Sequence, residues 1–422
     1  MTSGTNSDPN AAVIWSEDFL AYKWAYTHPM NPVRLALTMS LARGLGVLDG
    51  IEEVPPQQID DSALTVIHGQ DYIDAVRAVG SGTAALSGQL LERLFGLGSA
   101  DNPVFAGMHE AGRLLVGGTL AAAQAVASGS VRRAVNIGGG MHHAMKSHAA
   151  GFCIYNDCSV AIQWLLDNGY DRVAYIDVDA HHGDGVETAF AADPRVLTIS
   201  LHQHPATLWP GTGWPTEIGT GDAQGTAVNL ALMPEVSDRL WLRAFHAVVP
   251  SLLEQFRPQI LITQCGADSH RADPLTDLAL TVDGQRAAMQ ALRTCADAYA
   301  DGNWVAVGGG GYGVVNVVPR SWTHLIATVL DRDVDVTTPV GDDWYTEAVT
   351  VATEIHPDYA RPPEESMGDG GDVDYVAWDG DTGQSPPEGI TEVAQRQTDR
   401  GILATRRAVY PLHGLDPEDP RD

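Results

Sequence analysis

The sequence has few lysines, few cysteines and no long apolar run. Lysine occurs only at Lys23 and Lys146, and 25 Lys and Arg stand against 54 Asp and Glu, for a net charge of -29. Phosphate binding needs a basic face, so this balance excludes direct binding to nucleic acid. An acidic surface favours cationic substrates or simply keeps a protein soluble, and we favour the second explanation.

The chain also lacks the segments that direct a protein to a membrane or out of the cell. No apolar stretch reaches the 18 residues that suggest a membrane span, and residues 1–10 have neither the basic start nor the apolar core of a secretory signal. The four cysteines show no CxxC spacing and no dense framework, which is typical of reduced thiols. We therefore expect a soluble cytoplasmic protein with no membrane partner.

What the chain does have is a polar cluster that directly follows an apolar strand. Residues 173–178 are mostly apolar and rich in β-branched types, which predicts a short buried strand. Asp177, Asp179 and His181 are spaced by two, so an extended chain places all three on one side. Two readings stay open here: a carboxylate network with solvated histidines, or a ligand site.

From residue 131 onward, apolar strands alternate with helical patterns, and each strand ends in glycines or ionisable residues. This pattern predicts an α/β fold in one domain: a central parallel sheet flanked by helices, with the site at the carboxyl ends of the strands. The expected strands are 11–15, 131–137, 173–178, 196–201, 259–264 and 304–307, and the main expected helices are 35–45, 108–128, 159–168, 239–256 and 284–299.

Three residues at these strand ends have the chemistry of a catalytic metal site. Asp179, His181 and Asp268 supply two carboxylates and one imidazole, which leaves coordination positions open for water and substrate. A metal ion there would polarise a carbonyl and make bound water a nucleophile near neutral pH. Zinc is the expected metal, and Fe²⁺ is an alternative because this ligand set does not select between them by geometry.

Other strand ends offer the proton carriers that such a site needs. His142 and His143 follow three glycines, and either could act as general base and then as general acid. Asp177 and Asp184 are candidates to fix their tautomers. Tyr312 follows four glycines and could donate to a developing oxyanion. A phosphate cradle is disfavoured, because neither glycine run has the residues of a P-loop or a dinucleotide fingerprint.

Taken together, the motifs at these strand ends strongly resemble the zinc-dependent histone deacetylase family. The resemblance covers roughly residues 11–330, and His270-Arg-Ala-Asp-Pro-Leu-Thr is most similar to the bacterial acetoin-utilisation (AcuC-type) branch. The motifs, in order, are Gly138-Gly-Gly-Met-His-His, Gly151-Phe-Cys, Asp177-Val-Asp-Ala-His-His-Gly-Asp-Gly, Pro210-Gly-Thr-Gly, Gly266-Ala-Asp and Gly308-Gly-Gly-Gly-Tyr.

The resemblance implies an arginase/deacetylase-like fold and a role for each of these residues. His143 would be the main general base and acid, with His142 as its electrostatic partner, and Tyr312 would polarise the acetyl carbonyl. The carboxylates behind the two histidines would be Asp177 for His142 and Asp184 for His143. The ion sites would be zinc on Asp179, His181 and Asp268, and potassium on Asp177, Asp179, His181, Ser200 and the Leu201 carbonyl.

The resemblance also implies a narrow tunnel for the stem of acetyl-lysine, between two aromatic side chains and a glycine. These positions correspond to Phe152, Trp209 and Gly151, and Trp209 departs from the commoner phenylalanine, which puts the preferred acyl chain in question. Asp101 resembles the rim aspartate that holds the substrate backbone. Leu275 stands where some polyamine-selective relatives carry an acidic gatekeeper, which favours acetylated protein.

We therefore expect a metal-dependent amidohydrolase that removes acetyl groups from lysine side chains of cytoplasmic proteins. The AcuC resemblance suggests acyl-CoA synthetases as substrates, and an acetylpolyamine or other small-amide deacetylase is the alternative. An arginase-type two-metal enzyme would need a carboxylate where Gly183 stands. A catalytically inactive binding protein is disfavoured because every expected ligand, both histidines and the tyrosine are present.

The expected organisation has three parts: a flexible N-terminus (1–10), a catalytic domain (11–330) and a partly irregular C-terminal extension (331–422). Residues 364–389 are rich in Gly, Pro and Asp, which is typical of a loop or flexible tail. Arg34 begins a helix and is either a surface residue or points inward to a carboxylate. His68 and Tyr72 lie in a helical pattern and are expected to be structural.

Overall fold

The computed structural model describes residues 10–25, 27–380 and 385–422. The predicted flexible N-terminus falls almost entirely on residues 1–9, which lie outside the described part.

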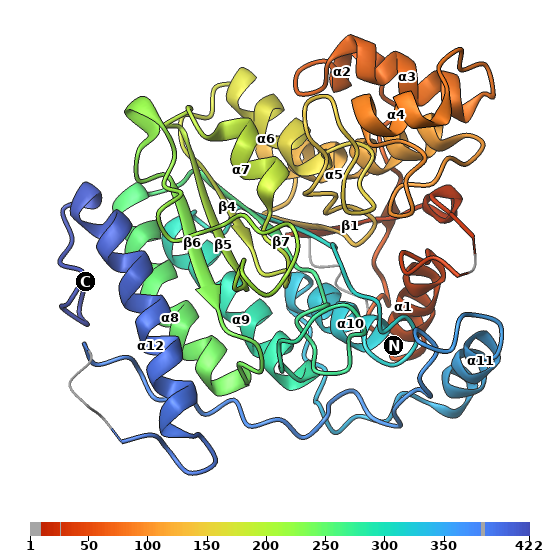
Figure 1. Ribbon diagram of the computed structural model, residues 1–422. Helices are drawn as coiled ribbons and strands as arrows, with labels where there is room; N and C mark the ends of the chain where they lie inside the picture. Colours follow the sequence, from red (N-terminus) through yellow and green to blue (C-terminus); the bar gives the residue numbers. More distant parts are fainter. Residues whose placement is uncertain (1–9, 26, 381–384) are drawn as a thin grey trace.

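A single parallel sheet of eight strands forms the centre of the described chain (Figure 1). Its strand order is β2-β1-β3-β8-β7-β4-β5-β6, and the predicted α/β fold is confirmed. The strands are β1 (Ala11–Ile14), β2 (Glu53–Val54), β3 (Arg133–Asn136), β4 (Val173–Asp177), β5 (Val196–Gln203), β6 (Ala227–Leu232), β7 (Ile260–Gln264) and β8 (Trp304–Val307).

The middle strands are buried along their whole length because helices cover both faces of the sheet. Helices α5, α6 and α7 lie on one face, and α8, α9 and α10 on the other (Figure 1). Every residue of β4, β5 and β7 is buried, as expected for a parallel sheet covered on both sides. The α-helices from α5 to α10 are α5 (Met108–Ala127), α6 (Asp157–Asp167), α7 (Asp184–Phe190), α8 (Asp238–Phe256), α9 (Val282–Tyr299) and α10 (Val318–Val329).

The N-terminal third adds smaller helices around the sheet. Helix α1 packs against α10, and α3 packs against α5. His68 and Tyr72 are buried here and bond to backbone groups between residues 145 and 156. These contacts agree with the predicted structural role. The helices are α1 (Val33–Gly44), α2 (Asp61–Leu64), α3 (Gln70–Gly80) and α4 (Gly88–Phe95), with a 3-10 turn at Glu17–Ala21.

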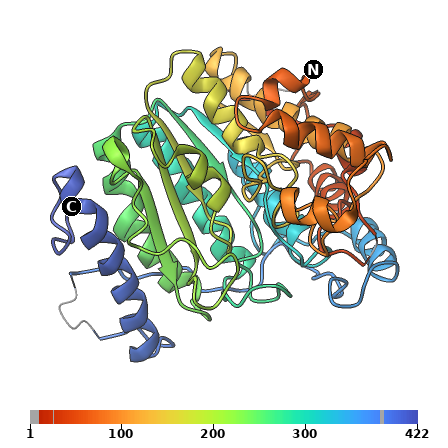
Figure 2. The ribbon, with the colours of Figure 1, turned by 45° about the horizontal axis from the view of Figure 1, so that its top comes forward.

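Strand β6 and two C-terminal helices were not predicted. Strand β6 forms an edge of the sheet, and helix α12 (Glu392–Val409) packs against it and against α8, as both views show (Figures 1 and 2). Thr405 of α12 donates to the carbonyl of Asn229 in β6 at 2.7 Å. Helix α11 (Asp342–Ala352) packs on α1.

The glycine-rich segment 364–389 has no helix or strand among its described residues, as the prediction of a loop implied. It is nevertheless fixed to α8. Arg243 donates to the carbonyls of Val376 and Ala377, and Arg239 to those of Asp374 and Glu388. The extension therefore lies along the rest of the fold as a bound segment, which no sequence pattern predicted.

Candidate active site

The three predicted metal ligands meet beyond the ends of β4 and β7. Asp177 is the last residue of β4, so Asp179 and His181 follow in the turn; Asp268 follows β7, the neighbouring strand. One ligand atom from each of Asp179, His181 and Asp268 lies within 4.8 Å of the others, and all three residues are buried. His181 Nδ1 is 3.2 Å from Asp179 Oδ1 and 2.9 Å from Asp268 Oδ2.

This donor set fits a divalent cation. Two carboxylates against one imidazole leave a buried excess of negative charge, and burial together with the charge of Asp179 raises the pKa of Asp268 to about 6. Hydrogen bonds from neighbouring groups fix the orientation of Asp179: its Oδ2 accepts from Gln264 Nε2 at 2.7 Å and from the Gly310 amide at 2.8 Å. Such outer contacts are what a metal site needs to hold its ligands in place.

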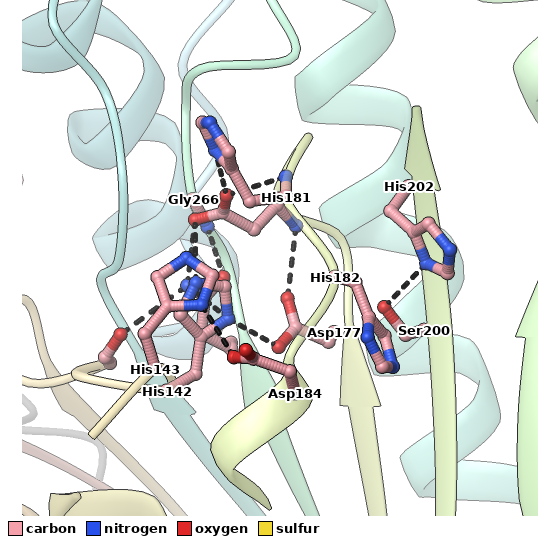
Figure 3. A network of polar contacts seen from close by, with 12 residues as sticks. His142, His143, Asp177, His181, His182, Asp184, Ser200, His202 and Gly266 are labelled. Carbon is pink, nitrogen blue, oxygen red and sulfur yellow. Dashed lines mark hydrogen bonds and ion pairs between the residues drawn. The ribbon is translucent and has the colours of Figure 1, made fainter. Parts of the chain in front are cut away.

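The adjacent histidines each have a carboxylate partner (Figure 3). His142 Nδ1 lies 2.7 Å from Asp177 Oδ2, and His143 Nδ1 lies 2.7 Å from Asp184 Oδ1, which are the pairings that the resemblance implied. The Tyr175 hydroxyl also donates to Asp177 Oδ2, at 2.6 Å.

The surroundings give the two histidines opposite protonation states. Burial opposes a charge on His142, but Asp177 and Asp179 outweigh it and raise the pKa of His142 to about 9. Burial, with the positive charge of His142, lowers the pKa of His143 to about 4, although Asp184 acts in the opposite direction. At neutral pH His143 is thus a neutral imidazole whose Nδ1 hydrogen faces Asp184, leaving the lone pair on Nε2 to accept a proton.

Tyr312 is placed by contacts to its own backbone and to the glycine run before it. Its amide donates to Asp273 Oδ2 at 2.7 Å, and Arg34 donates to the carbonyls of Gly309 and Gly311, both at 2.8 Å. Both glycines have positive φ, so the turn requires them. Burial and the charges of nearby carboxylates raise the pKa of Tyr312 well above its usual value, so the phenol keeps its proton.

The contacts of Arg34 bear on the question that the sequence left open. Its side chain points into the interior rather than to the surface, but its hydrogen bonds go to backbone carbonyls and to Met30 Sδ instead of to the expected carboxylate. It also lies over the ring of Trp322, 4.8 Å from the ring centroid. It therefore shapes the glycine run that carries Tyr312.

The predicted tunnel residues lie beside this cluster. The ring centroid of Trp209 is 4.6 Å from that of His143, and the ring centroid of Phe152 is 5.6 Å from that of Tyr312. Trp209 is 45% exposed, so the side of the cluster next to His143 faces solvent there. Phe152 has a φ of 67°, unusual for an aromatic residue, and its carbonyl accepts from the Tyr22 hydroxyl at 2.8 Å.

The remaining predicted residues are Asp101, Leu275, Ser200 and Leu201. Asp101 is exposed and connects to the tunnel through His28, which bonds to the Asp101 carbonyl and packs on Phe152. Leu275 is half-buried, and its amide donates to Asp273. Ser200 is aligned with Asp177 across β4 and β5, and Leu201 follows it in β5.

The sequence reasoning missed several residues that this geometry uses, notably His28, Gln264 and Asp273. Gln264 had a readable signal, since it is a polar residue closing an otherwise apolar strand. Asp273 and His28 lie in loops, and nothing in their local spacing points to the site.

Comparison with known proteins identifies the family. The model of the histone deacetylase domain matches residues 28–329, which is more than two thirds of the chain. The chain belongs to the histone deacetylase family. It is therefore a deacetylase, a hydrolase of a family that is metal-dependent and usually uses zinc.

Curated relatives place this deacetylase near the AcuC proteins. It is 42% identical over 317 residues to the acetoin utilization protein AcuC of Bacillus subtilis, covering 75% of this chain and 81% of the relative. It is 33% identical over 349 residues to AcuC of Staphylococcus xylosus, covering 83% and 90%. These similarities agree with the branch that the sequence motifs indicated.

Solved structures agree with this placement. The crystal structure of an HDAC homolog from Aquifex aeolicus superposes with a TM-score of 0.77 at 25% identity, covering 93% of this chain and 99% of that one. An HDAC homolog complexed with SAHA superposes equally well. Among the described residues of the deacetylase, no helix is both long and apolar enough to cross a membrane.

Proposed function

We propose that this deacetylase hydrolyses the acetyl amide of N-ε-acetyl-lysine in cytoplasmic proteins. The observation that carries the proposal is the convergence, in one buried site, of a carboxylate–imidazole cluster, two carboxylate-backed histidines and a protonated tyrosine. The similarity to AcuC proteins makes acetylated acyl-CoA synthetases the first substrate class to examine.

Asp179, His181 and Asp268 would hold the divalent cation, as zinc or Fe²⁺. Bound there, the cation supplies Lewis-acid chemistry, polarising the amide carbonyl and acidifying water. Asp177, Asp179, His181, Ser200 and the Leu201 carbonyl would form the nearby potassium site.

His143 carries the proton through the reaction. Its Nε2 accepts a proton as the water oxygen attacks the carbonyl carbon, and Asp184 stabilises the imidazolium that forms. The same nitrogen then returns the proton to the lysine nitrogen as the C–N bond breaks, releasing acetate and the free amine. His142, already charged, stabilises the negative charge that develops beside it.

Tyr312 stabilises the other end of the same charge separation. Its hydroxyl donates to the carbonyl oxygen as that oxygen becomes negative, which is the role of an oxyanion-hole donor. Arg34 fixes the glycine run before the tyrosine and Asp273 fixes the tyrosine's own amide, so the hydroxyl is aimed before substrate arrives.

The entrance would grip the acetyl-lysine stem between Phe152 and Trp209, with Gly151 leaving room for it. Asp101 would bind the substrate backbone at the rim, and the apolar Leu275 favours a peptide over a polyamine. The net charge of -29 favours the opposite choice, since it attracts polycations. An acetylpolyamine or other small-amide deacetylase is therefore the second candidate.

The test measures acetate release by zinc-loaded protein from an acetyl-lysine peptide and from acetylspermidine, side by side, with a chelator control. Chelator-sensitive turnover with the higher kcat/KM for the peptide supports the proposal. A higher value for acetylspermidine replaces it with the polyamine function, and turnover that resists metal removal contradicts both.

A further inference from the structure

The C-terminal extension touches the loop of the metal ligand Asp268 through one buried carboxylate, Asp369. This residue lies outside the region matched by the family model, which ends at residue 329. Its side chain is 6% exposed and sits between two partners of the catalytic fold: Oδ2 lies 2.7 Å from His270 Nε2, and Oδ1 accepts from Arg320 at 2.7 Å. The Val282 amide also donates to Asp369 Oδ2, and the Asp369 amide donates to the Asp283 carboxylate, so Asp369 is itself held in place.

His270 connects Asp369 to the backbone of the loop. Its Nδ1 accepts from the Ala272 amide at 3.0 Å, so Nε2 carries the proton and donates to Asp369. The His270 carbonyl in turn accepts from the Asp273 amide at 2.8 Å. The ring and the carbonyl of His270 therefore bond to two amides of the same tight turn. Asp369 holds the ring in the orientation in which Nδ1 faces the Ala272 amide.

This turn separates two groups that define the site. Asp268, a proposed metal ligand, lies two residues before His270, and Asp273, which accepts from the Tyr312 amide, lies three residues after it. A shift of the turn would move a metal ligand and the backbone of the proposed oxyanion donor together.

Other contacts hold the start of the loop independently. Thr276 donates to the Asp268 carbonyl, and Gln285 donates to the Ala267 carbonyl at 2.9 Å. Loss of the Asp369 contact is therefore expected to misplace the site partially rather than to abolish it.

We propose that Asp369 is a positioning residue for deacetylation, through which the C-terminal extension orients Asp268 and Tyr312 by way of His270. This inference rests on the proposed metal site and mechanism. It gives the extension a direct part in orienting the site. An extension that only stabilised the fold would have no single residue whose loss specifically impairs catalysis.

The chain offers a matched control for this idea. Asp399, also in the extension, pairs with Arg243 at 2.7 Å, and both are nearly buried. This pair joins α12 to α8 and has no contact with the loop of residues 268–273 among the interactions of the described residues. Asp399→Asn and Asp369→Asn thus remove the same kind of ion pair, and only one of them adjoins the site.

The experiment compares both variants in full-length protein by three readouts: melting temperature, kcat and KM with the acetyl-lysine peptide, and zinc affinity by competition with a chromophoric chelator. Asp369→Asn is expected to lower kcat and weaken zinc binding by about tenfold each, with KM little changed, as for other residues that orient metal ligands. Asp399→Asn is expected to lower the melting temperature while kcat and zinc affinity stay within about twofold of wild type.

Equal kcat and zinc affinity in the two variants would overturn the proposal and leave Asp369 a purely structural residue. If Asp369→Asn fails to fold, His270→Gln tests the same path, because it keeps the ion pair between Asp369 and Arg320. Wild-type protein without deacetylase activity would instead refute the proposed function, and the chelator competition would still decide whether Asp369 orients the metal site.

Discussion

At the scale of single residues, the site gives two identical side chains different charge states through their different neighbours. His142 and His143 are adjacent in sequence, with ring centroids 3.9 Å apart, and each faces its own carboxylate. His142 additionally lies 3.9 Å from Asp179, while His143 is buried beside a charged neighbour. In the proposed mechanism one is a fixed positive charge and the other a proton acceptor, which divides electrostatic and acid–base work between them.

Tyr312→Phe removes one hydrogen-bond donor and little else. We expect kcat to fall by about 100- to 1000-fold with KM nearly unchanged, because the lost bond forms mainly in the transition state. Steady-state kinetics measure this. Tyr72→Phe is the control, since it removes a buried hydroxyl that bonds to the Ile154 carbonyl, away from the site. Equal kcat in Tyr312→Phe and wild type would refute the oxyanion role.

Gly151→Ala tests the tight entrance. A methyl group at Gly151 would lie 2.7 Å from the ring of Trp209 and closer still to His143. We expect kcat/KM to fall by about 100-fold as the general base is displaced. Gly129→Ala is the control, because Gly129 also has positive φ but nothing lies within 4 Å of the added atom. An equal fall in kcat/KM in both variants would mean that backbone strain, rather than crowding at Gly151, causes the loss.

Much of this site was readable from the sequence because strand ends and glycines are local signals. The metal ligands and His142 follow apolar strands, so a parallel sheet must bring them to one edge. The loop residues that complete the site carried no such signal. Asp273 and Asp369 act through partners 39 and 99 residues away, Tyr312 and His270, and no spacing rule connects them.

At the scale of elements, helix α12 shows how the extension joins the fold. It covers the edge strand β6 and α8, and its Arg406 is fully buried, where it donates to the Ala247 carbonyl and lies over Tyr410. An uncovered edge strand is a template for aggregation, so the helix protects the sheet as well as adding core. Strand β6 was not predicted because its six residues do not end in the glycines or ionisable groups that marked the other strands.

Ile402→Ala tests whether α12 unfolds together with the catalytic fold. Ile402 is fully buried, so we expect the loss of its side chain to lower the free energy of unfolding by about 2–5 kcal/mol. Urea denaturation followed by tryptophan fluorescence measures it. Val393→Ala on the same helix is the control, because Val393 is 66% exposed. A separate early transition, with the main one unchanged, would show that α12 melts independently.

At the scale of the whole molecule, several of the scarce positive charges lie inside the fold. Arginines 34, 243, 320 and 406 are all nearly or fully buried, and each ties together segments distant in the chain. Several histidines are buried too, and burial lowers the pKa of each of His68, His109 and His324 to about 4. Acid should therefore weaken the fold at a few identifiable positions.

His68 gives a defined pH dependence. Its pKa lies near 6.5 when exposed and about 4 in the folded protein, so the unfolded state binds the extra proton between these values. The stability that a neutral His68 provides is complete above pH 6.5 and is lost as the pH falls toward 4. We expect the stability advantage of wild type over His68→Gln to shrink by about 1.4 kcal/mol per pH unit between pH 6 and 4.5.

Urea denaturation at a series of pH values checks this expectation. The His356→Gln variant serves as the control, because His356 is only half-buried. A stability difference between wild type and His68→Gln that does not vary with pH would show that His68 is not protonated on unfolding.

The scarcity of lysine has one more consequence under the proposed function of a lysine deacetylase. Its two lysine side chains, Lys23 and Lys146, are both exposed, on the N-terminal segment and on the loop after the paired histidines. Acyl donors in the cell can therefore modify the side chains of this enzyme at no more than two lysines. Under the proposed function, this enzyme offers few sites for the modification that it removes.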